Sequence, residues 1–140
     1  MKLTKASLTS PAQTPETIKS IFAVMNEKAH AQAVAADLAG AYAFTAEFDG
    51  EVDEIVALAG AACASGESCT IDVLKNGATI LTSTAAFTAS SGKVVRLALD
   101  KDKKSFKAGD VFTVTRDYTA GGTPTPLANT TVIIRPTFSF

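Results

Sequence analysis

The chain has 140 residues, of which 46% are hydrophobic and 19% charged, and its formal net charge is −1. Its 13 basic residues stand against 14 acidic ones, so we expect it to bind neither nucleic acid nor an anionic membrane. A chain of this length buries about two thirds of its unfolded surface. That predicts one folded domain that requires no metal, cofactor or disulfide.

The N-terminal residues form a leader that differs from the rest of the chain. Residues 1–14 are rich in Thr, Ser and Lys and contain no apolar run for a signal-peptide core or a membrane span, so we expect an arm on a protein made in a cytosol. A short helix is predicted to start at Thr14-Pro15-Glu16, where threonine can cap free N–H groups and proline suits the first helical position. The next residues place one apolar stripe at helical spacing, formed by Ile18, Ile21, Phe22, Met25 and Ala29.

The alanine-rich run at residues 29–39 fits either a continued helix or an extended segment, because its periodicity favours neither. Gly40 then ends the leader. We therefore divide the chain into an N-terminal arm and amphipathic segment, residues 1–40, and a β-sandwich domain, residues 41–140.

Apolar and polar residues alternate from Tyr42 onward, which is typical of half-buried strands. In the first strand, Tyr42, Phe44, Ala46 and Phe48 are expected on one face. Further strands are expected at residues 51–59, 69–75, 78–81, 93–99, 111–118 and 130–140, with a polar connection at 82–91. Seven or eight strands predict a mainly β fold, a single jelly-roll-like β-sandwich preceded by the arm and a short helix.

Three pairs of turn residues separate these strands. Asn76 and Gly77 both tolerate positive φ, so they predict a type I′ hairpin in which Lys75 pairs with Ala78. Turns are also expected at the dipeptides Asp49-Gly50 and Gly109-Asp110.

Few residues could carry out a reaction. The only histidine, His30, has no nucleophile motif beside it, so we expect a surface or packing residue and no catalytic site. The acidic residues at 49–54 and 100–102 lack the spacing of a calcium loop and are interpreted as solvated loop charges. Cys63 and Cys69 could form a disulfide across the turn between them, but a reducing cytosol favours two half-buried thiols.

Three segments show the same order of strands and turns as a known class of module: Phe-Asp-Gly-Glu-Val at 48–52, the hairpin at 70–81, and Phe-Lys-Ala-Gly-Asp-Val at 106–111. Together they resemble the small jelly-roll-like β-sandwich modules of tailed bacteriophage virions, found in head decoration (cement) proteins, head fibres and tail fibres. The resemblance implies a non-enzymatic structural protein, made in the host bacterial cytoplasm, that decorates and stabilises the capsid exterior.

On this interpretation the partner is the major capsid protein, and the protein is a homotrimer. The leader would supply much of the grip, so the candidate capsid or oligomer interface is Ile18, Ile21, Phe22 and Met25. The alternative is a phage fibre or adhesin module that binds a host receptor or glycan through its loops, at residues 100–104 or 121–127.

Overall fold

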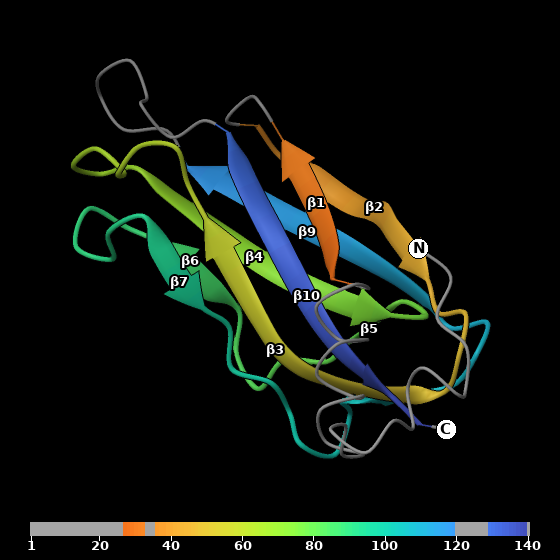
Figure 1. Cartoon of the computed structure of the whole chain (residues 1–140). Coiled ribbons are helices and arrows are strands. Elements are labelled where there is room, and N and C mark those ends of the chain that lie inside the picture. The colour runs from red at the N-terminus through yellow and green to blue at the C-terminus, as the bar shows by residue number, and fades with distance from the viewer. Residues whose placement is uncertain (1–26, 33–35, 120–128, 140) are drawn as a thin grey trace, which may run out of the picture.

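The computed structural model describes residues 27–32, 36–119 and 129–139. Within these ranges every regular element is a strand, and two antiparallel sheets stack face to face as a jelly-roll-like β-sandwich (Figure 1). The mainly β prediction is therefore confirmed. The helix predicted from residue 15 lies outside the described residues, and within them no helix could cross a membrane.

Each sheet has five strands. We call them the β10 sheet and the β9 sheet after a long strand in each. The β10 sheet has the order β1 (Lys28–Gln32), β10 (Thr130–Phe138), β3 (Gly50–Leu58) and β7 (Val94–Arg96), with β8 (Ser105–Phe106) paired to the start of β3. The β9 sheet has the order β2 (Leu38–Thr45), β9 (Val111–Thr119), β4 (Ser68–Lys75) and β5 (Ala78–Thr79), with β6 (Ala85–Phe87) also paired to β4.

The described residues form ten strands instead of the seven or eight expected, because short strands arise in segments that were interpreted as leader or loop. The connection at 82–91 contains β6, and Phe87 at its end is fully buried. The charged loop at 100–104 is followed directly by β8.

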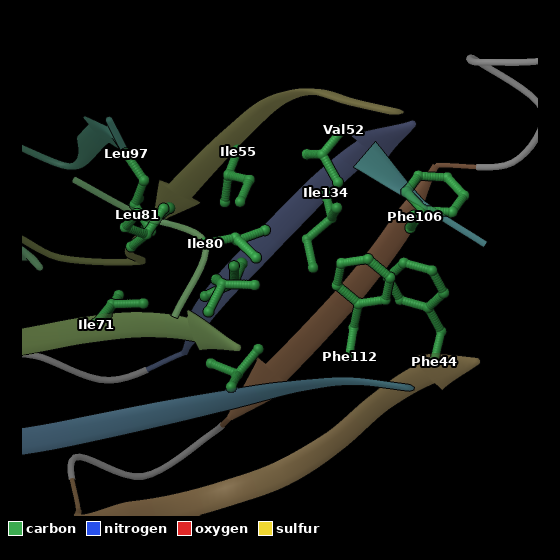
Figure 2. Close-up of a cluster of buried hydrophobic side chains, with 14 of the residues drawn as sticks. Phe44, Val52, Ile55, Ile71, Ile80, Leu81, Leu97, Phe106, Phe112 and Ile134 are labelled. Carbon is green, nitrogen blue, oxygen red and sulfur yellow. The ribbon is translucent and has the colours of Figure 1, made fainter. Parts of the chain in front are cut away.

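Side chains from both sheets meet in one core (Figure 2). Phe44 stacks on Phe112 with ring centroids 4.5 Å apart, and Phe106 approaches Phe112 edge-on at 5.6 Å. Most of the phenylalanines expected inside are buried there, whereas Phe48 is 51% exposed. The rings of Phe44, Phe106 and Phe112 fill the core at the end of the sandwich where β3 begins.

The expected face of the first strand is wrong for Tyr42, which is 63% exposed while Phe44 is buried. Tyr42 pairs with Thr113 and Phe44 with Phe112, so two steps on β2 match one step on β9. This irregularity at Ala43 reverses the alternation, as a β-bulge does, and turns Tyr42 to solvent.

The boundary expected at residue 40 falls later than the start of the sandwich. Residues 28–32 form β1 on the edge of the β10 sheet, and β2 already begins at Leu38. The alanine-rich run is thus extended rather than helical where it is described, because it hydrogen-bonds to residues 130–134 far along the chain. β1 and β2 lie side by side at one edge of the sandwich (Figure 1).

The turn at Asn76-Gly77 is confirmed. Asn76 has φ +51° and Gly77 φ +84°, and Lys75 pairs with Ala78 as a two-residue hairpin requires. Gly109 also lies in a turn, with φ +96°, and the N–H of Asp110 donates to the Lys107 carbonyl at 3.1 Å.

The turn expected at Asp49-Gly50 does not join two paired strands, because β2 and β3 lie in different sheets and the chain crosses between them. Gly50 begins β3 and is buried. A Cβ there would lie 2.3 Å from the Thr137 carbonyl oxygen and 3.0 Å from the Phe138 Cα. Glycine is needed for this close approach of two backbones rather than for a turn.

Pro136 occurs within β10, a central strand, where the missing N–H would break a ladder. It lies beyond Ile134, the last residue of β10 that pairs with β1, and at a register shift opposite β3. The proline is tolerated because of this position.

Candidate functional site

Residues from each of the segments 48–52, 70–81 and 106–111 line a pocket of about 300 Å³ at one end of the sandwich, with Lys75 as the contribution of the second segment. We call it the loop-end pocket. Its walls come from the start of β3, the end of β4, β8 and the turn before β9, and the lining residues are Asp49, Gly50, Glu51, Lys75, Ser105, Phe106, Lys107, Asp110 and Ser139.

Two carboxylates hold the turns around this pocket together. Asp49 accepts hydrogen bonds from the Ala108 N–H at 2.9 Å and from Lys107 Nζ at 3.5 Å. The bond from the Ala108 backbone, aided by the charge of Lys107, lowers the pKa of Asp49 below its usual value.

Asp110 joins the two neighbouring turns. It accepts from the Lys107 N–H at 2.9 Å and from Asn76 Nδ2 at 2.8 Å, and these two bonds, the backbone one first, lower the pKa of its carboxyl. The Asn76 amide oxygen in turn accepts from the Val111 N–H at 2.9 Å. The hairpin at 76–77 is therefore fastened to the start of β9.

The remaining charges of the pocket also have partners. Lys75 Nζ donates to the Ser105 carbonyl at 2.6 Å, which fixes β8 against the end of β4. Glu51 lies 3.3 Å from Lys104 Nζ. The hydroxyls of Ser105 and Ser139 have no imidazole to activate them, because the only histidine is on β1 and contacts Arg116.

A second polar group lies between the sheets, where β1 faces β9. Arg116 is 1% exposed, and its Nη1 lies 2.7 Å from His30 Nδ1 while its Nη2 donates to the His30 carbonyl at 2.9 Å. A guanidinium can only donate, so Nδ1 accepts, and the imidazole is neutral with its proton on Nε2. Burial, followed by the charge of Arg116, lowers the pKa of His30.

The groups around Arg116 are buried and inert. Burial raises the pKa of the Cys69 thiol to about 11 and also raises that of Cys63, and both cysteines are free. Such thiols are poor nucleophiles and poor metal ligands at neutral pH. Glu67 is buried and accepts from the Tyr118 hydroxyl at 2.7 Å and from the Ala64 N–H at 2.7 Å.

The outer face of the β10 sheet carries a row of alternating charges. Arg96 pairs with Glu54, Glu54 lies 2.6 Å from Arg135, and Arg135 lies 2.9 Å from Glu27. Beside this row, Val56 pairs with Ile133 across the sheet. The row ends at Glu27, the residue that precedes β1.

The candidate interface residues Ile18, Ile21, Phe22 and Met25 lie outside the described residues. Of the predicted turn residues, the structure brings Asp49, Gly50, Asn76 and Asp110 together at the loop end. Sequence reasoning did not identify Arg116 as a buried partner of His30. One signal for its burial is present in the sequence: in the alternation of β9, Arg116 falls on the same face as Phe112 and Val114.

In the part of the chain that the structure describes, no three metal-ligating side chains gather in one place. Comparison of the chain with protein-family models, with curated proteins and with solved structures found no match.

Proposed function

We propose that this chain is a non-enzymatic structural protein of a bacteriophage virion. It binds the major capsid protein, decorates and stabilises the outside of the capsid, and assembles as a homotrimer. The proposal is supported by the resemblance of segments 48–52, 70–81 and 106–111 to virion modules, together with a β-sandwich in which residues of each segment line one pocket.

One observation carries the proposal: the sandwich holds residues 27–30, which directly follow the N-terminal segment, by specific contacts. Residue 27 pairs with Arg135 on the outer face, and His30, three residues later, is held by Arg116 between the sheets. The chain that follows the predicted apolar stripe is thus fixed to the sandwich by one ion pair and by hydrogen bonds from a buried guanidinium. Segments that order on docking can cover a large area of a flat shell, which a small sandwich alone does not offer.

The experiment is a deletion of residues 1–26, tested by co-sedimentation with purified capsids. A deletion to residue 40 would remove β1 and the start of β2 and so damage the sandwich itself. We expect the truncated chain to keep its β circular-dichroism signal and to lose most of its capsid binding. A matched control is the full chain with Lys101→Ala, a change in an exposed loop residue.

Capsid binding as tight as that of the full chain would mean that the sandwich is the anchor. Absence of binding by the full chain itself would contradict the proposed function. Sedimentation of the full chain in solution tests the trimer separately.

A fibre or adhesin module is the second candidate, favoured by the loop-end pocket. The loop at 100–104 borders this pocket, since Lys104 pairs with Glu51 and Lys75 approaches the Lys103 carbonyl at 3.5 Å. A pocket with both signs of charge suits a polar receptor or glycan. Binding to host-cell envelopes but not to capsids, abolished by Lys104→Ala together with Glu51→Ala, would favour this function.

A further inference from the structure

Strand β1 is attached to the sandwich mainly by polar contacts. Among the described strands of five or more residues, it is the one without a buried side chain. Lys28, His30 and Gln32 point inward, while Ala29 and Ala31 point outward and are exposed. Hydrophobic burial therefore contributes little to holding β1, and the backbone ladder with β10 and a few polar contacts hold it.

The main polar contact is the one between Arg116 and His30. The guanidinium uses Nη1 on the imidazole and Nη2 on the carbonyl of the same residue, so it fixes both the side chain and the backbone of β1. In the described ranges Arg116 makes no ion pair with a carboxylate. A buried cation thus depends on a neutral imidazole as an acceptor.

Unpaired polar atoms at this contact weaken it. Over the described residues, the buried side-chain atoms without a hydrogen-bond partner are Gln32 Oε1 on β1 and Arg116 Nε on β9. A buried polar atom without a partner costs free energy, so docked β1 carries a penalty that its release would remove.

Over the described residues, no carboxylate forms an ion pair with His30 that could offset a second positive charge. Lys28 on its own strand is a cation, and the β10 residues opposite are Thr130, Val132 and Ile134. From the β9 sheet, the group in contact with His30 is Arg116, whose charge also acts on the Cys69 thiol. Nearby carboxylates are engaged elsewhere: Glu67 with Tyr118 and Ala64, and Asp37 with the Tyr118 N–H at 2.6 Å.

We propose that β1 is a pH-controlled latch in which uptake of a proton from solvent by His30 Nδ1 detaches residues 28–32 from β10. The protonated nitrogen can no longer accept from Arg116 Nη1, and two cations then lie at hydrogen-bond distance. Release of β1 exposes the two cations, His30 and Arg116, to water. It also removes the attachment of the residues that precede β1. The inference concerns the chain by itself and does not depend on capsid binding.

The sign of the effect follows from linkage. The pKa of His30 is lower in the folded chain than its ordinary value, so the unfolded or detached chain binds more protons as the pH falls. The contact therefore contributes its full stability above the ordinary histidine pKa, about 6.5, and loses it as the pH falls through the lower folded value. β1 is latched at neutral pH and released in acid.

The test uses the full-length chain and two measurements over the range from about pH 7.5 to about pH 5, in which histidine titrates. Because the chain has one histidine, its imidazole nitrogen signals in NMR belong to His30 alone. We expect the Nε2–H tautomer at neutral pH and a titration midpoint below the ordinary value. Hydrogen exchange, corrected for intrinsic rates, should show residues 28–32 losing protection by up to about tenfold per unit of pH between the ordinary histidine pKa and that lower midpoint, with no further loss below it.

Two variants separate the latch from general acid unfolding. His30→Asn keeps an acceptor close to the position of Nδ1 but does not titrate, so residues 28–32 should stay protected in acid. Arg116→Met removes the buried cation, so the midpoint of His30 should rise towards its ordinary value; if this variant does not fold, the titration of the unmodified chain decides alone. Protection of 28–32 that persists while His30 titrates, or a midpoint at or above the ordinary value, would overturn the proposal. Loss of protection in β4 and β9 together with β1 would overturn it as well.

Discussion

Polar groups are arranged differently at the loop end and at the β1 edge of this sandwich. At the loop end, Asp49 and Asp110 are exposed or nearly so, and each accepts from a backbone N–H and a side chain within the neighbouring turns. At the β1 edge, a buried arginine relies on a neutral histidine 86 residues away in the chain, and polar atoms remain unpaired. The first arrangement fastens the fold together, whereas the second can open.

The two regions owe their rigidity to different kinds of contact. Turn residues satisfy their backbone locally, and water screens whatever charge is left over. A buried polar contact between distant segments has neither local hydrogen bonds nor screening by water, so the gain of a single proton changes its free energy. The predictions below test whether the loop end is as rigid as its contacts imply.

The largest effect is expected for Gly50→Ala. The new Cβ would overlap the Thr137 carbonyl oxygen and the Phe138 Cα, both backbone atoms that cannot move aside. We expect a loss of about 3 kcal/mol in the free energy of unfolding, measured by urea denaturation. Gly92→Ala is the control, since nothing lies within 4 Å of its Cβ and only the strain of φ +74° is added. An equal loss in both variants would contradict close packing at Gly50.

A smaller loss is expected for Gly77→Val, because a β-branched residue resists the φ of +84° at this turn position. The cost should be about 2 kcal/mol, seen as a lower melting temperature. Ala78→Val, one residue later and exposed in β5, should change stability by less than about 0.5 kcal/mol. A melting temperature unchanged by Gly77→Val would show that this hairpin does not stabilise the loop end.

The smallest effect concerns acid. The pKa values of Asp49 and Asp110 are lowered in the folded chain, so both groups contribute stability that is present above the ordinary value of 3.8 and lost as the pH falls through the lower folded values. The double variant Asp49→Asn, Asp110→Asn should therefore show a flatter decline of stability below that pH. Asp49 is exposed and Asp110 is partly exposed to solvent, so the change should be modest. A decline as steep as that of the unmodified chain would assign the acid sensitivity to other groups.

The features that could be predicted from the sequence are those set by a few adjacent residues. Asn76-Gly77 specified both its turn type and its register, because two residues with positive φ permit one common hairpin. The alternation of β4 and β9 likewise specified which side chains are buried. Both depend on local backbone geometry alone.

The features that could not be predicted depend on which sheet a strand joins. Asp49-Gly50 has the same turn signal as Asn76-Gly77, but the following strand crosses to the other sheet, so the glycine has a packing role. His30 was expected to be a surface or packing residue, and it is partly buried on the inner face of β1. Its partner could not be foreseen, because no local pattern connects β1 with β9.

Pro136 has a consequence for how copies of this protein behave when crowded. An exposed strand edge is a template on which another chain can add a strand, and a proline lacks the N–H that such pairing requires. On the side of β10 where β1 ends, the edge beyond Ile134 contains this proline. Strand addition is therefore disfavoured there, and along this edge of β10 the described residues that pair with β1 become a template at times when β1 leaves them.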